Sequence, residues 1–89
     1  MLEIVRKSQF KKDFKKLLSS GKDFEKLAEV IRLLQIPEAL PPHNRDHNLI
    51  GEHRGCRECH ITGDWLLVYQ QTEKELILYR TGSHSELFR

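Results

Sequence analysis

The sequence predicts an α+β domain in which a helical hairpin packs on one face of an antiparallel β-sheet. One observation is that residues 8–35 carry apolar side chains at helical spacing, with a glycine near the middle. Another is that residues 54–80 consist of runs of strand-forming residues separated by turn residues. The resulting order is β-α-α-β-β-β, and such segregation of helices and strands is typical of α+β folds.

The first half of the chain predicts one strand and two helices. Residues 2–6 are a short run of strand-forming residues. Ser8 is the expected N-cap of the first helix, and Gly21 is expected to end it. The second helix is expected from about residue 23 to 35, because Pro37 follows. The apolar sides of the two helices consist of Phe10, Phe14, Leu17, Leu18, Phe24, Leu27, Ala28, Val30, Ile31 and Leu34.

The second half predicts a long loop and three strands. Residues 36–54 are rich in proline, histidine, asparagine and aspartate, and loops of this length in small domains tend to be functional. Strands are expected at about residues 54–61, 65–71 and 75–80, with the first turn at Thr62-Gly63. The middle strand is apolar on both faces, which predicts a central position in the sheet.

Length and hydropathy limit the class of protein. A chain of 89 residues has room for one core, so we expect a single domain over residues 1–89. No apolar run approaches the ~20 residues that span a bilayer, and the first residues lack the layout of a signal peptide. We therefore expect a cytoplasmic protein with no membrane partner.

Charge is distributed unevenly along the chain. Residues 1–36 contain nine lysines and arginines against five acidic residues, whereas the remainder contains six against eight. The lysines of the first helix, among them Lys11 and Lys15, therefore offer a basic surface suited to a polyanion. A solvated helix face without a ligand is the alternative.

Cys56 and Cys59 form a C-x-x-C motif, a spacing that occurs in zinc sites and in redox-active proteins. In a strand, side chains three residues apart point to opposite faces, and no helix follows as a redox motif normally requires. We therefore expect two free thiols, no metal and no cofactor.

Chemically versatile side chains collect in the second half of the chain, at His47, His60, Asp64, Arg80 and His84. Cleavage of RNA without a metal needs a base for the 2′-hydroxyl, an acid for the leaving 5′ oxygen and positive charge beside the phosphorane. Imidazole, with an ordinary pKa near ~6.5, can serve as base and as acid. Arg80 is the candidate donor to the phosphoryl oxygens, and Asp64 is the candidate that orients a histidine.

Two aromatic residues, Trp65 and Phe88, are candidates for contact with a base or sugar. A tight turn at Thr62-Gly63 would place Trp65 opposite His60 on one face of the sheet. Phe88 follows His84 by four residues, so the two would share a face of a short C-terminal helix.

Each candidate also has a structural alternative. A histidine in a strand, such as His60, can be purely structural. Trp65 can belong to the core, and Asp64 can serve only to form a turn. Arg80 can form an ion pair with Glu58 or Asp64. The combination of these residues, rather than any one of them, favours a nuclease.

Three motifs occur together: Asp46-His47-Asn48-Leu49-Ile50-Gly51, His60-x-x-x-Asp64-Trp65-x-Leu67-x-Tyr69 and Arg80-Thr81-Gly82-Ser83-His84-x-x-Leu87-Phe88. They resemble the RelE/ParE superfamily of bacterial toxins, and within it the YafQ-type mRNA interferases. The resemblance covers essentially the whole chain and implies a RelE-like microbial RNase fold. It implies functional positions at His47, His60, Asp64, Arg80, His84 and Phe88.

The resemblance implies a toxin of a type II toxin-antitoxin system that cuts mRNA in the ribosomal A site by metal-independent acid–base transesterification. Its implied partners are a cognate antitoxin, mRNA and the ribosome, with operator DNA reached only through the antitoxin complex. Lys11 and Lys15 would then contact ribosomal RNA. Leu66 stands where RelE-type enzymes carry arginine, so the chemistry is inferred from the YafQ branch, without assigning which histidine is acid and which is base.

Two other functions remain open from the sequence. A ParE-like toxin would share the fold and act on DNA gyrase without enzymatic activity, but that branch does not carry the set of His60, Asp64 and His84. A small RNA-binding or protein-binding module would make the histidines incidental.

Overall fold

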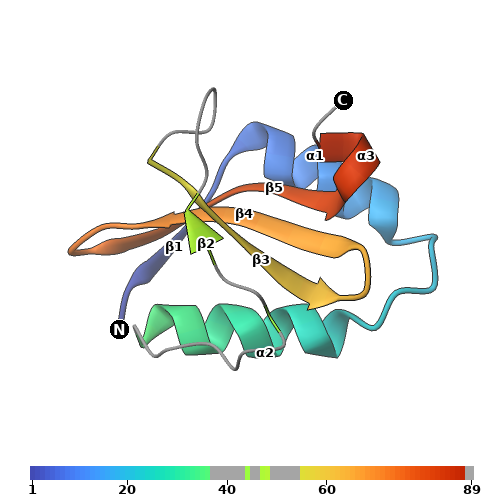
Figure 1. Cartoon of the computed structure of the whole chain (residues 1–89). Helices are drawn as coiled ribbons and strands as arrows, with labels where there is room; N and C mark the ends of the chain where they lie inside the picture. Colours follow the sequence, from blue (N-terminus) through green and yellow to red (C-terminus); the bar gives the residue numbers. More distant parts are fainter. Residues whose placement is uncertain (37–43, 45–46, 49–54, 88–89) are drawn as a thin grey trace.

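The structure, a computed structural model, describes residues 1–36, 44, 47–48 and 55–87, with residues 47–48 described by their backbone (Figure 1). Over these residues the chain forms, in order, β1 (Glu3–Arg6), α1 (Ser8–Leu17), α2 (Phe24–Gln35), β2 (His47–Asn48), β3 (Arg57–Thr62), β4 (Trp65–Gln71), β5 (Glu75–Ser83) and α3 (His84–Leu87). The predicted α+β class and the order of its main elements are confirmed.

The strands form one mixed sheet in the order β1-β5-β4-β3-β2. The pairs from β5 to β2 are antiparallel, whereas β1 runs parallel to β5, with Glu3 opposite Glu75 and Arg6 opposite Leu78. The expectation of an entirely antiparallel sheet is therefore wrong for β1. Parallel neighbours need a long connection between them, and the chain between β1 and β5, which includes α1 and α2, provides it.

The strands also differ from the prediction at their ends. β3 begins at Arg57 rather than near residue 54, and β5 continues to Ser83 rather than ending near residue 80. The extension of β5 has a partner, because Ser83 lies opposite Trp65 of β4. The two residues of β2 lie within the expected loop and pair with the outer edge of β3.

β4 is the central strand and is buried on both faces, as its apolar sequence predicted. Trp65, Leu67 and Tyr69 lie in the cluster formed with α1 and α2, whereas Leu66 and Val68 belong to a smaller cluster on the other face. All five residues are at most 1% exposed. The larger cluster also contains Leu2, Phe10, Leu17, Leu27, Val30, Leu34, Cys59, Ile61, Leu76 and Leu78.

The two long helices begin in different ways. Lys7, not the expected Ser8, is the N-cap of α1, and it forms no side-chain capping bond. The backbone N–H of Lys7 donates to the carbonyl oxygen of Leu78 at 3.0 Å, so the extended chain of β1 continues to the residue where the helix begins. Asp23 caps α2 by accepting the N–H of Glu25 at 3.1 Å. No helix in the described part of the chain is long and apolar enough to cross a membrane.

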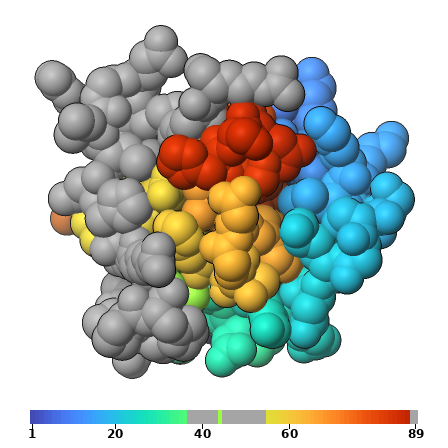
Figure 2. Space-filling view, turned by 45° about the vertical axis from the view of Figure 1, so that its right-hand side comes forward, coloured from blue at the N-terminus to red at the C-terminus, as the bar shows by residue number. Residues whose placement is uncertain are grey.

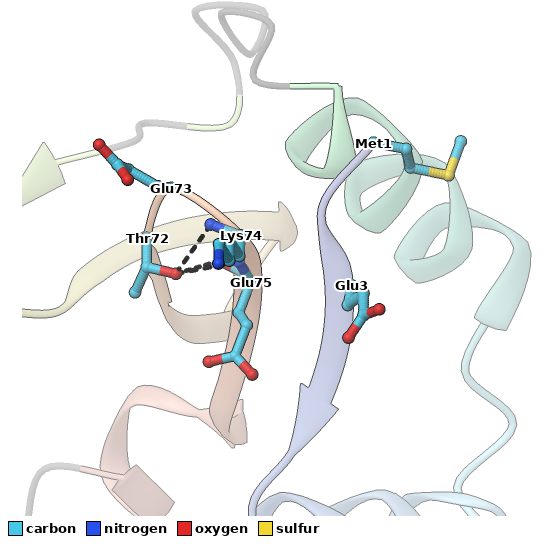
Figure 3. Close-up of a pocket in the computed structure, with 6 residues that line it drawn as sticks. All are labelled: Met1, Glu3, Thr72, Glu73, Lys74 and Glu75. Carbon is cyan, nitrogen blue, oxygen red and sulfur yellow. Dashed lines mark hydrogen bonds between the residues drawn. The ribbon is translucent and has the colours of Figure 1, made fainter.

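The turn between β4 and β5 borders a surface hollow of about 740 Å³ (Figure 3). Thr72 shapes this turn, because its Oγ1 accepts the N–H of Glu75 at 2.9 Å and the N–H of Lys74 at 3.3 Å. The hollow lies where β5 begins. The candidate functional residues of β5 and α3 lie at the opposite end of that strand.

Candidate active site

His60 and Trp65 lie on opposite faces of the sheet, so the expectation that they share a face is wrong. In the pairing of β3 with β4, His60 lies opposite Leu66 and Thr62 lies opposite Trp65, with an irregularity between His60 and Thr62. An extra residue in one strand changes which side chains share a face. His60 therefore lies on the face of Leu66, away from α1 and α2.

Trp65 is a core residue in this fold. Its side chain is 1% exposed, and its Nε1 donates to Oγ1 of Thr81 at 2.9 Å. The ring also meets the ring of Phe24 edge to face, with 5.7 Å between centroids. Trp65 therefore belongs to the core, which was the alternative to contact with RNA. Contact with a base would require the ring to leave this packing.

His60 is held from two sides on its face of β3. Its Nδ1 lies 3.3 Å from the carbonyl oxygen of Gly63, and its Nε2 lies 3.7 Å from Oε1 of Glu58. The His60 side chain remains 20% exposed, whereas Glu58 is only 5% exposed. The imidazole can therefore reach solvent while a carboxylate and a carbonyl restrict its orientation.

The long loop is attached to β3 at two points that the structure describes. Asn44 is 3% exposed, and its Nδ2 donates to the carbonyl oxygen of His60 at 2.6 Å. The backbone of His47 pairs with that of Glu58, two residues from His60 along the same strand. The strand of His47 therefore lies beside the strand that carries His60.

Asp64 connects the turn after β3 to the start of α3. Its Oδ1 accepts the backbone N–H of His84 at 3.2 Å. The expectation was that Asp64 orients a histidine, and the contact acts through the main chain of His84 rather than through its ring. His84 is exposed at the first position of α3. Phe88 lies outside the described residues.

A capping box fixes the start of α3. Oγ of Ser83 accepts the N–H of Glu86 at 3.2 Å, and Oε1 of Glu86 accepts the N–H of Ser83 at 2.8 Å. The bond from the Ser83 backbone is the main cause of a lowered pKa for Glu86. Gly82 precedes the box with φ 155°, and a Cβ there would lie 3.2 Å from Oε1 of Glu86. Glycine is therefore needed where the strand turns into the helix.

Arg80 forms an ion pair, but with Asp13 of α1 rather than with Glu58 or Asp64. Its Nε lies 2.8 Å from Oδ2 of Asp13, and its Nη2 lies 3.2 Å from Oδ1. Burial raises the pKa of Asp13, but its hydrogen bonds with Arg80 and other neighbours outweigh burial, so that the pKa is lowered overall. The bond with Asp13 is also the main cause of a raised pKa for Arg80. Both groups are therefore charged at neutral pH.

Lys11 and Lys15 are exposed on α1, as both interpretations of the basic helix require. Figure 2 shows α1 and α3 side by side on one surface of the molecule. Lys16 joins them, because its Nζ lies 3.7 Å from Oε2 of Glu86. The basic helix therefore adjoins the helix that carries His84.

Cys59 of β3 and Cys56, which directly precedes β3, pack on opposite faces of the sheet, as predicted. Cys59 is buried in the cluster with α1 and α2, whereas half-buried Cys56 packs against the cluster on the other face, and neither forms a disulfide bond. Burial raises the pKa of Cys56. Among the described side chains, no three or more His, Cys, Asp or Glu residues are grouped to hold a metal ion.

Several solved structures that share this fold are bacterial toxins, which indicates the class of the protein. A copper-bound mutant toxin from Helicobacter pylori is 51% identical, with a TM-score of 0.94 over 99% of this chain and 100% of that one. The YafQ chain of the Escherichia coli DinJ–YafQ complex is 37% identical, with a TM-score of 0.91 over all of both chains.

Sequence comparison names the family. The chain belongs to the YafQ family, bacterial toxins of type II toxin-antitoxin systems, which its residues 2–89 match. The mRNA interferase toxin YafQ of Escherichia coli strain K12 is 38% identical over 97% of this chain and 95% of its own length. The resemblance seen in the sequence motifs is thereby confirmed at the level of the YafQ branch.

Three residues of the site region were not among the predicted functional residues, although Glu58 was considered as an ion-pair partner of Arg80. Glu86 had a readable signal, because Ser83-x-x-Glu86 has the spacing of a capping box. Glu58 had a weaker signal, since residues two apart in a strand share a face and place it beside His60. Asp13 had none, because nothing in the sequence pairs it with an arginine 67 residues further along the chain.

Proposed function

We propose that this toxin is an endoribonuclease that cleaves mRNA in the ribosomal A site and thereby inhibits translation. Membership of the YafQ family and the name of the Escherichia coli relatives, mRNA interferase, support the substrate class. The observation that carries the site assignment is the 3.2 Å bond from the His84 backbone to Asp64, because Asp64 directly follows Gly63, the neighbour of the His60 ring. Two imidazole-bearing segments are thus joined at one end of the sheet.

The proposed reaction is metal-independent transesterification. The 2′-hydroxyl attacks the adjacent phosphorus and loses its proton to one imidazole, while a second imidazole gives a proton to the departing 5′ oxygen. The products are a 2′,3′-cyclic phosphate and a 5′-hydroxyl. His60 and His84 carry the proton transfers, His47 assists, and Arg80 stabilises the charge on the phosphorane. Glu58 restrains the ring of His60, and Asp64 positions His84.

The same proposal assigns the partners. A cognate antitoxin would hold the toxin inactive in the cytoplasm, and the complex of DinJ with the related YafQ supports this. Operator DNA would be reached only through the antitoxin complex. Lys11 and Lys15 would contact ribosomal RNA, and Phe88 would pack against the substrate. Trp65 would act from the core, by supporting the turn that carries Asp64.

Single-turnover cleavage of RNA by folded variants tests the roles of the histidines. General acid–base catalysis contributes ~10²–10⁴ in rate, so His60→Ala and His84→Ala should each lose cleavage by about that factor. Both variants should keep the far-ultraviolet circular dichroism and antitoxin binding of the wild type. His43→Ala is the matched control, because the proposal gives this histidine no role. Near wild-type rates in both His60→Ala and His84→Ala would contradict the assignment and favour an action on DNA gyrase.

A further inference from the structure

The carboxylate of Asp13 is the structural centre of the contact between α1 and the end of β5. It accepts two hydrogen bonds from Arg80, at 2.8 Å from Nε and 3.2 Å from Nη2. It also accepts the backbone N–H of Thr81 at 3.2 Å, and Nε2 of Gln9 donates to it at 3.1 Å. Four bonds thus fix this carboxylate relative to both elements.

The pairing uses one edge of the guanidinium and, among the described residues, leaves the other edge without a hydrogen-bond partner. A guanidinium carries five N–H donors in a rigid plane, and the bonds to Asp13 occupy one on Nε and one on Nη2. The remaining donors, on Nη1 and Nη2, form the second edge, which matches the spacing of two phosphoryl oxygens. Arg80 is 28% exposed, whereas Asp13 is 11% exposed, so the carboxylate lies on the inner side of the pair.

The surroundings of the pair are suited to an anion. Asp13 and Arg80 border a hollow of about 170 Å³ that is also lined by Lys12, Lys16 and Glu86. With Arg80, three cations therefore face two carboxylates across this hollow. A phosphodiester that approached the open edge of Arg80 would meet a net positive region.

The geometry points to Asp13 as a positioning residue that holds the guanidinium of Arg80 with its open edge toward the phosphoryl group of the RNA. This inference rests on the proposed function, because it gives Asp13 a role only through Arg80. A flexible arginine would need to be ordered during the reaction. Asp13 orders it beforehand, and misplacement of a positioning contact by about 1 Å can cost ~10²-fold in rate.

The test separates the positioning of Arg80 from RNA affinity. Asp13→Asn removes the charge that orders Arg80 but also removes negative charge near the substrate. We expect the single-turnover rate constant to fall about 10- to 100-fold, while the dissociation constant for RNA stays unchanged or decreases. Asp13→Glu keeps the charge and should give a rate between Asp13→Asn and the wild type. Glu73→Gln, which converts an exposed carboxylate in the distant turn between β4 and β5 to an amide, is the matched control and should stay within about twofold of the wild type.

A double variant shows whether Asp13 acts through Arg80. In an Arg80→Ala background, Asp13→Asn should change the rate by less than about twofold, because the group that it positions is already missing. If the rate losses of Asp13→Asn and Arg80→Ala were fully additive, the inference would be overturned. The loss in Asp13→Asn would then reflect a general effect on the fold. If Asp13→Asn does not fold, Asp13→Glu is used in both backgrounds, and a wild-type rate in that variant would overturn the inference.

Failure of the proposed function and failure of the positioning role of Asp13 give different results. Wild-type cleavage by Arg80→Ala would overturn the role of Arg80 in the proposed function. Slow cleavage by Arg80→Ala together with wild-type cleavage by Asp13→Asn would overturn the positioning role alone. Each result is measured on the full chain with the same RNA.

Discussion

At the scale of single residues, acidic groups contact three of the proposed site residues. Asp13 holds Arg80, Glu58 lies beside His60, and Asp64 binds the backbone of His84. The sequence offered candidate groups for the chemistry, because motifs and residue types are local. It could not predict the Arg80 partner, since any of several acidic residues could fold back onto that guanidinium.

The Asp13 carboxylate should make stability depend on acid. Its pKa in the folded chain lies below the ordinary value of 3.8, so the unfolded chain binds this proton more tightly. The stabilisation is therefore fully present above about pH 5 and is lost as the pH falls through the lowered pKa. Urea unfolding at pH 6 and pH 3 should show a smaller acid loss in Asp13→Asn than in the wild type. Equal losses in the two proteins would contradict this linkage.

At the scale of secondary structure, α1 has two sides with separate roles. Phe10 and Leu17 are buried under the sheet, whereas Lys11 and Lys15 are exposed. Both helices were predictable, because hydrophobic periodicity is a local property of the sequence. The partner of β1 and the short β2 were not predictable, because pairing between distant segments leaves no local pattern. The irregularity after His60 was not predictable because Thr62-Gly63 is not a strong hairpin dipeptide that would fix the register.

Reversal of the charge on α1 should weaken binding to the ribosome without affecting the fold. If Lys11 and Lys15 contact phosphates, affinity falls steeply with salt, and Lys11→Glu with Lys15→Glu should flatten that dependence. Co-sedimentation with ribosomes across a salt series measures both effects. The control is Lys74→Glu, at the turn beyond the other end of β5. Identical salt dependence in the wild type and the α1 variant would show that these lysines do not contact phosphates and belong to a solvated helix face.

At the scale of the whole molecule, the two faces of β4 pack against different helices, and the proposed catalytic residue His60 lies on the side of only one of them. The face with Trp65, Leu67 and Tyr69 packs against α1 and α2, while the face with Leu66 and Val68 packs against α3 and lies on the side of His60. Side chains of the proposed acid–base set come from β3 and α3, and the arginine comes from β5. Their assembly therefore depends on the whole sheet.

Cleavage should not depend on a divalent metal, because the proposed acid, base and cation are all side chains of the protein. Excess EDTA should leave the single-turnover rate on naked RNA within about twofold of the untreated value. The structure of a related toxin with copper bound makes this measurement necessary. Loss of cleavage that Mg²⁺ or Zn²⁺ restores would contradict the metal-independent mechanism.

The parallel pairing of β1 with β5 also determines when the toxin can fold during its synthesis. Glu3 pairs with Glu75, so β1 has no neighbour among the described strands until β5 has been made. Contacts between residues so far apart in the chain form late and slowly. Nascent chains that stop before β5 therefore lack both the sheet edge for β1 and the arginine that pairs with Asp13.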